Sequence, residues 1–256
     1  MWRKTKTIAL FAALEAVRGR LVVLLLVTLV AGFLFAELAG AAAVTESTSI
    51  KIAFLAAFLR ATAVFLTSLF VVTSIARELA DKGADLVLSL ALPRYVYYCG
   101  KGLGYALVAL VTAAVFGVVM AFYAPANQAL LWTASLFCEL MIIAALSLLC
   151  MFTFAQVTSA LSAVAAFYLL ARVIDAIQLM SHGPLVDPNA WSQKLIAAMV
   201  DGVAYLLPEL YRYTSSDWLV YHTGNFVALM PILAQTVIYL TVLGAAGLFD
   251  LYRKNF

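Results

Sequence analysis

The chain has 256 residues, of which 66% are apolar and 11% are charged, and its mean hydropathy is +1.04. This composition excludes an ordinary soluble domain, because the apolar residues form runs of about 18 or more, the length that a helix needs to cross a bilayer. The net charge of +3, without a Lys/Arg tract interleaved with aromatic residues, also excludes a nucleic-acid-binding protein. We expect a single membrane domain over residues 1–256.

The first predicted element is an N-terminal amphipathic helix over residues 5–21. Its apolar residues recur at helical spacing and form one stripe: Leu10, Leu14, Val17 and Leu21. Glu15, Arg18 and Arg20 make the same segment too polar to span a membrane. We therefore expect an interfacial helix on the cytoplasmic membrane surface.

Six apolar segments follow, each long enough to cross a membrane as a helix. They cover about residues 21–38, 52–76, 102–123, 130–154, 159–180 and 226–249. The predicted fold class is an all-α membrane protein with six transmembrane helices.

The basic residues predict the orientation, because cytoplasmic loops are enriched in Lys and Arg. Eleven of the 16 basic residues fall before the first span, between the second and third, or after the sixth. They are Arg3, Lys4, Lys6, Arg18, Arg20, Arg77, Lys82, Arg94, Lys101, Arg253 and Lys254. The other side holds Lys51, Lys194 and Arg212. Both termini are therefore expected to be cytoplasmic.

The longest external segment, residues 181–225, precedes the sixth span. Residues 190–207 have helical spacing, and the segment also contains rings that favour the headgroup level: Tyr205, Tyr211, Tyr213, Trp218 and Tyr221. We expect short helices that rest on the outer leaflet or re-enter it. A solvated loop with scattered aromatic residues is the alternative.

The cytoplasmic connection between the second and third spans is charged and amphipathic. Leu86 and Leu90 give it an apolar side, and the polar side carries Glu78, Asp81, Lys82 and Asp85. Pro93 is expected to end this helix, because a proline disfavours helical backbone in the residue before it. A helix of this kind is suited to docking a cytosolic partner.

This stretch resembles the permease subunits of the ABC-2 type transporter family. The likeness is carried by Glu78, the Leu86 to Leu90 stretch, Pro93-Arg94, an aromatic at Tyr97 or Tyr98, and Gly100-Lys101. The overall layout is also similar to that of the family: an interfacial helix, six spans, an external segment before the sixth span, and a basic tail. The motif itself covers about 25 residues.

The resemblance implies a permease that moves its cargo with energy from a separate ATPase, which would bind ATP and Mg²⁺. It also implies a second permease chain, identical or different, and a location in the bacterial inner membrane. The residues expected to couple to the ATPase are Arg77, Glu78, Asp81, Lys82, Asp85, Pro93 and Arg94. The chain contains no GxxxxGK[ST] phosphate loop, and we expect Gly100, Gly102 and Gly104 to allow close helix packing instead. Export of a hydrophobic or amphipathic cargo is favoured.

Four ionisable residues lie inside the predicted spans: Arg60, Glu139, Arg172 and Asp175. Each charge at the bilayer centre costs at least about 2.5 kcal/mol, so each needs a reason to be there. Arg172 and Asp175 are three residues apart on one helix, which predicts a local ion pair within a structural clamp. The second hypothesis is that some of these groups line an outer vestibule and contact a polar part of the cargo.

Other functions remain open at this stage. An ion-coupled secondary transporter is the main alternative, because buried ionisable groups can carry a coupling ion. A scaffold is another. An enzyme is not expected, because the spans contain no Ser/His pair, facing aspartates or His/Glu metal site, and Cys99, Cys138 and Cys150 lack metal-ligand spacing.

Overall fold

The protein is described from a computed structural model, which describes residues 2–43, 46–81, 93–182 and 191–253. Within these ranges the chain forms helices and no strands. The elements are α1 (Trp2–Arg18), α2 (Leu21–Ala42), α3 (Ser47–Ala80), α5 (Arg94–Met120), α6 (Ala126–Phe154), α7 (Val157–Ser181), α8 (Trp191–Leu206), η1 (Leu210–Arg212), α9 (Asp217–Val220), η2 (Phe226–Ala228) and α10 (Leu229–Arg253).

Six of these helices are long and apolar enough to cross a membrane: α2, α3, α5, α6, α7 and the continuous η2–α10 segment. The protein is therefore an integral membrane protein, and the prediction of six spans is confirmed. Several helices extend beyond the apolar runs, most clearly α5, which begins at Arg94 rather than near residue 102. Pro93 directly precedes α5 and has extended backbone, so it marks the start of this helix.

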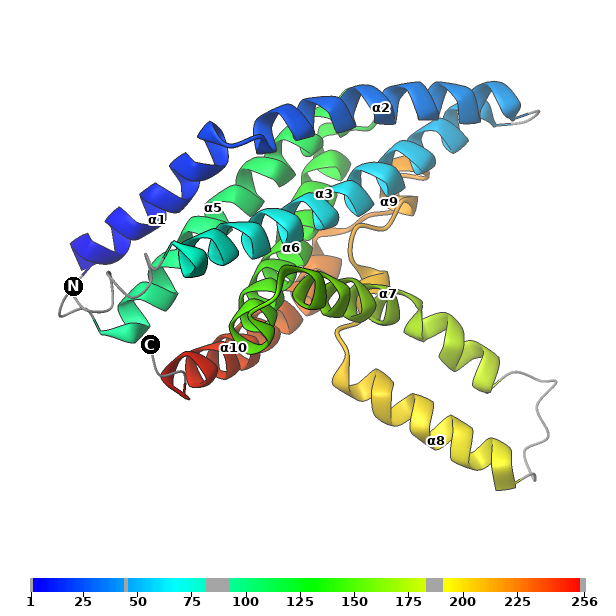
Figure 1. Cartoon of the computed structure of the whole chain (residues 1–256). Coiled ribbons are helices and arrows are strands. Elements are labelled where there is room, and N and C mark those ends of the chain that lie inside the picture. The colour runs from blue at the N-terminus through cyan, green and yellow to red at the C-terminus, as the bar shows by residue number, and fades with distance from the viewer. Residues whose placement is uncertain (1, 44–45, 82–92, 183–190, 254–256) are drawn as a thin grey trace.

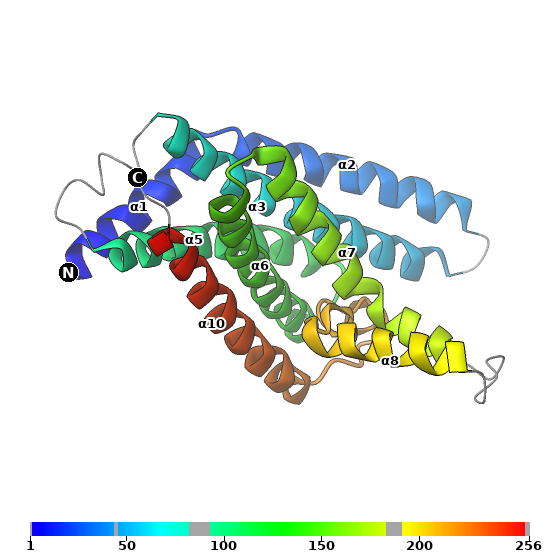
Figure 2. The ribbon, with the colours of Figure 1, turned by 60° about the horizontal axis from the view of Figure 1, so that its bottom comes forward.

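Helix α6 lies at the centre of the bundle and packs against α3, α5, α7 and α10 (Figures 1 and 2). It is largely apolar, and 72% of its most apolar 18-residue stretch is buried. The buried share of the corresponding stretch is 17% for α2, 17% for η2–α10 and 22% for α7. Because these three helices expose large apolar side chains, they are the ones with the greatest surface for hydrocarbon.

Helix α1 packs along α5 through small residues. A Cβ atom built on Gly104 would lie 2.5 Å from Ala12 Cβ, and one built on Gly100 would lie 2.9 Å from Ile8 Cβ. The prediction that these two glycines allow close packing is confirmed, whereas a Cβ on Gly102 would meet no described atom within 4 Å. Three residues of the predicted apolar stripe face outward and are exposed: Leu10, Leu14 and Val17. The fourth, Leu21, is buried and belongs to α2, because α1 ends at Arg18 and not at residue 21 as predicted.

Helix α8 runs beside the end of α7, and the two project together from the rest of the bundle (Figure 1). The polar side chains of the two helices face each other: Asp201 accepts from Gln178 Nε2 at 3.1 Å and contacts His182 Nε2 at 3.1 Å. The bond to His182, followed by that to Gln178, holds the pKa of Asp201 below its usual range. No α8 side chain, all of which lie in the described part, is buried, and Trp191 and Tyr205 are highly exposed.

Candidate functional site

Three spans bring ionisable side chains together around residues 210–214, which we call the anchor. Arg60 comes from α3, Glu139 from α6 and Arg172 from α7. Glu139 is fully buried, and Arg172 Nη1 lies 4.0 Å from its Oε1. The spans therefore place charged groups in one cluster despite the cost of burying them.

The two guanidiniums of the cluster donate to backbone carbonyls of the anchor. Arg60 Nη1 donates to the Thr214 carbonyl oxygen at 3.3 Å. Arg172 Nη1 donates to the Tyr213 carbonyl oxygen at 3.0 Å and also to that of Leu210. The Leu210 carbonyl oxygen also accepts from the Tyr213 amide at 3.1 Å. The arginines supply donors to the buried residues Tyr213 and Thr214, where an unsatisfied acceptor would cost more than a hydrogen bond between exposed groups contributes.

Thr214 is the most constrained residue of the anchor. Its φ of +48° is left-handed, a conformation that a β-branched residue rarely adopts and that costs on the order of 1–3 kcal/mol. Its amide donates to Ser135 Oγ at 2.9 Å, and its hydroxyl donates to Glu139 Oε2 at 2.9 Å. Because the side chain is fully buried and bonded on both sides, the surrounding helices hold it in this strained conformation.

Tyr213 ties the anchor to α10. Its hydroxyl donates to the Ile232 carbonyl oxygen at 3.1 Å and shares a hydrogen bond of 3.1 Å with the Thr236 hydroxyl. Its ring is fully buried among the helices, so it packs inside the protein and does not contact lipid headgroups. Through these bonds the anchor connects four spans: α3, α6, α7 and α10.

The predicted ion pair within α7 does not form. Arg172 pairs with Glu139, whereas the charge of Asp175 interacts with that of Arg212 in η1. The structure thus brings Arg60, Glu139 and Arg172 together and leaves Asp175 apart. The sequence analysis missed Ser135 and Thr214, since a hydroxyl residue in an apolar helix or loop carries no signal of its distant partners.

The predicted coupling residues that the structure describes lie where α1, α3, α5 and α10 converge, and three of them make contacts between helices. Arg77 Nη2 lies 3.2 Å from Glu15 Oε1 of α1. Glu78 Oε2 lies 2.5 Å from Lys101 Nζ of α5.

Arg94 joins the start of α5 to the end of α10. Its Nη1 donates to the carbonyl oxygens of Leu251 at 2.8 Å and of Tyr252 at 3.0 Å. Asp81 is exposed just after α3, and Pro93 directly precedes α5. Lys82, Asp85 and the predicted coupling helix over 82–92 lie outside the described residues.

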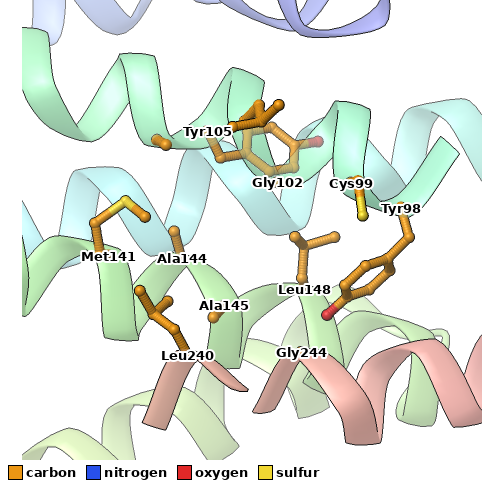
Figure 3. A pocket seen from close by; sticks show the side chains of 12 residues that line it. Tyr98, Cys99, Gly102, Tyr105, Met141, Ala144, Ala145, Leu148, Leu240 and Gly244 are labelled. Atoms are coloured by element: carbon orange, nitrogen blue, oxygen red, sulfur yellow. The ribbon is translucent and has the colours of Figure 1, made fainter. Parts of the chain in front are cut away.

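A pocket of about 390 Å³ lies between α5, α6 and α10 (Figure 3). Its walls are almost entirely hydrocarbon, with side chains such as Met141, Leu148 and Leu240, and with Gly102 and Gly244 on facing helices. The hydroxyl of Tyr98 and the thiol of Cys99 are polar groups near one end (Figure 3). Chemically, the pocket suits an apolar group.

The described part of the chain contains no group of three or more His, Cys, Asp or Glu side chains that could hold a metal ion. No protein-family model and no curated protein matches the chain in sequence comparison.

Proposed function

We propose that this chain is the permease subunit of an ABC transporter of the ABC-2 type, driven by a separate ATPase. The observation that carries the proposal is the cross-linking of α1, α3, α5 and α10 at the end of the bundle that holds the motif residues Glu78, Pro93, Arg94 and Lys101. A partner that moves this end moves all four helices, because each is bonded to another there. This is the mechanical property that a permease without its own ATPase requires.

In the proposed mechanism, ATP and Mg²⁺ bind between two ATPase subunits, and their closure moves the connection between α3 and α5 together with α1. The ion pairs of Arg77 with Glu15 and of Glu78 with Lys101 would transmit this movement between helices. The spans would then rearrange between states that open to opposite sides of the membrane.

The proposed setting is the bacterial inner membrane, with both termini cytoplasmic and with a second permease chain, identical or different. The positive-inside rule supports this orientation, because the basic residues of α1, of the facing ends of α3 and α5, and of the end of α10 share one side. The predicted interfacial position of α1 is supported by its outward apolar stripe, and that of α8 by its exposed apolar surface and its polar contacts with α7. Export of a hydrophobic or amphipathic cargo agrees with the apolar lining of the pocket in Figure 3.

The test is copurification of the tagged chain from native membranes, followed by an ATPase assay. We expect an ATPase to copurify with the wild-type chain. Asp81→Lys should reduce its recovery, because Asp81 is exposed beside the predicted docking segment. Glu78→Gln should leave recovery intact and lower turnover, because Glu78 is bonded inside the bundle.

The matched control is Asp217→Lys, which reverses an exposed aspartate of α9 and should change neither recovery nor turnover. A chain that purifies alone in mild detergent, without nucleotide dependence, would contradict the proposal. That result would favour the second candidate function, an ion-coupled carrier, for which the specific observation is the fully buried carboxylate of Glu139.

A further inference from the structure

The charge cluster around the anchor carries more positive than negative charge. Arg60, Arg172, Glu139 and Tyr168 are close enough to interact electrostatically, and Glu139 supplies the one carboxylate of this group. Tyr168 carries no charge at neutral pH. Two guanidiniums therefore share a single carboxylate, and they repel each other within a low-dielectric surrounding.

Backbone carbonyl groups, and not a second carboxylate, stabilise the remaining positive charge. The acceptors are the carbonyl oxygens of Leu210, Tyr213 and Thr214, all of which belong to the anchor. A carbonyl dipole offers only part of the stabilisation that an ionised oxygen gives a guanidinium, because charge-assisted hydrogen bonds are roughly twice as strong as neutral ones. Arg60 Nε is also buried, with no hydrogen-bond partner among the described residues.

We propose that Arg60 and Arg172 form a binding site for the anionic oxygens of a carboxylate or phosphate group, and that the anchor carbonyls occupy this site in the closed molecule. The guanidinium is planar, and its forked donors match carboxylate and phosphate oxygens in pairs. Displacement of the anchor would free the donors that now bond residues 210–214. The anion would then balance the charge that Glu139 leaves uncompensated.

The strain at Thr214 makes this exchange easier. Its left-handed backbone persists because hydrogen bonds to Ser135, Glu139 and Arg60 hold it. Release of the anchor would relieve this strain and thereby offset part of the loss of those bonds. Because the anchor also bonds to α10 through Tyr213, anion binding would loosen the contact between the external segment and that span.

The anion site is inferred from the structure and does not depend on the proposed function. The identification of the anion as the head group of an exported amphiphile does rest on the proposed function. The ligand class would then be an amphiphile with a negatively charged head group and a hydrocarbon chain. A cationic amphiphile is excluded by the same charge balance.

The test measures binding of decyl phosphate to the purified chain in nanodiscs of zwitterionic lipid by isothermal titration calorimetry. Arg60→Gln should weaken binding about tenfold or more, since it removes a charged donor. Tyr213→Phe should tighten binding about threefold or more, since it removes the hydroxyl bonds that hold the anchor in place. Lys194→Gln is the matched control and should change nothing, because it removes a basic side chain that is exposed on α8, outside the anchor and the charge cluster.

Decyltrimethylammonium should not bind with measurable affinity to any variant. The proposal is overturned if decyl phosphate fails to bind saturably, or if Arg60→Gln and Tyr213→Phe shift its affinity in the same direction. If Arg60→Gln does not yield folded protein, Arg60→Lys takes its place: it keeps the charge, loses the forked geometry, and should weaken binding severalfold. The assay contains no ATPase, so its failure would not bear on the permease proposal.

Discussion

Glu139 lies at the centre of the charge cluster. Arg172 pairs with one of its carboxylate oxygens, and the Thr214 hydroxyl donates to the other. Removing one partner of a buried ion pair leaves the other charge without compensation and costs about 3–5 kcal/mol. We therefore expect Glu139→Gln to lower the free energy of unfolding by about 3 kcal/mol. Thermal unfolding in detergent, followed by loss of monodispersity in gel filtration, measures this change.

Glu37→Gln is the control for Glu139→Gln. Glu37 lies 2.6 Å from Lys51 Nζ, but its side chain is 66% exposed, so solvent screens the pair. Loss of an exposed ion pair changes stability by about 0–1 kcal/mol. Equal effects of the two substitutions would mean that Glu139 has no special role in stability.

The sequence allows the charged residues of the cluster to be predicted but not their partners. Arg60, Glu139 and Arg172 stand out because ionisable groups are rare in apolar runs. Their contacts could not be inferred, since Arg60 donates to Thr214, which is 154 residues away. Local spacing predicted an ion pair of Arg172 with Asp175, and tertiary packing overrode it because Glu139 lies closer to the guanidinium.

At the scale of elements, the contact of α1 with α5 depends on the absence of a side chain at two positions. Gly104→Leu would bring its Cβ to 2.5 Å from Ala12 Cβ and 2.9 Å from the Ala9 carbonyl oxygen. Since neither atom belongs to a flexible side chain, α1 must move. We expect a destabilisation of about 1–3 kcal/mol and faster trypsin cleavage at Arg18 and Arg20.

Gly102→Leu provides a matched control on the same helix. The added Cβ would meet no atom of the described residues within 4 Å, and the leucine would enter the apolar pocket of Figure 3. Its trypsin cleavage pattern should equal that of the wild-type chain. If Gly104→Leu is cleaved no faster than Gly102→Leu, then α1 does not depend on close packing against α5.

Helix boundaries were harder to predict than the existence of the helices. Hydropathy detects the apolar run from residue 102, but α5 already begins at Arg94, because its first turns carry tyrosines and basic residues that also favour helix once packed. The same limit applies to α1, in which apolar spacing identified the exposed stripe. The small residues Ala9, Ala12 and Ala16, which face the bundle, recur at the same helical spacing, but alanine is too weakly hydrophobic to stand out beside leucine and valine.

At the scale of the whole molecule, the two ends of the bundle differ in charge. The N-terminal helix, the end of α10 and the facing ends of α3 and α5 gather at one end (Figure 1). Most of the basic residues belong to these segments. The opposite end holds the facing ends of α2 and α3 together with α8 and α9, and polar groups there include two pairs: Glu37 with Lys51, and Asp201 with His182.

This asymmetry leads to a topology prediction that thiol labelling tests. In a background with Cys99, Cys138 and Cys150 replaced by alanine, Ser47→Cys and Thr223→Cys should react with a membrane-impermeant maleimide in intact cells. Thr7→Cys and Asp81→Cys should react only after permeabilisation, because basic segments are retained on the cytoplasmic side. All four positions are exposed in the structure, so a difference in labelling reports sidedness rather than burial. Labelling of Thr7→Cys in intact cells would reverse the orientation, and the segments assigned to ATPase coupling would then lie on the side without ATP.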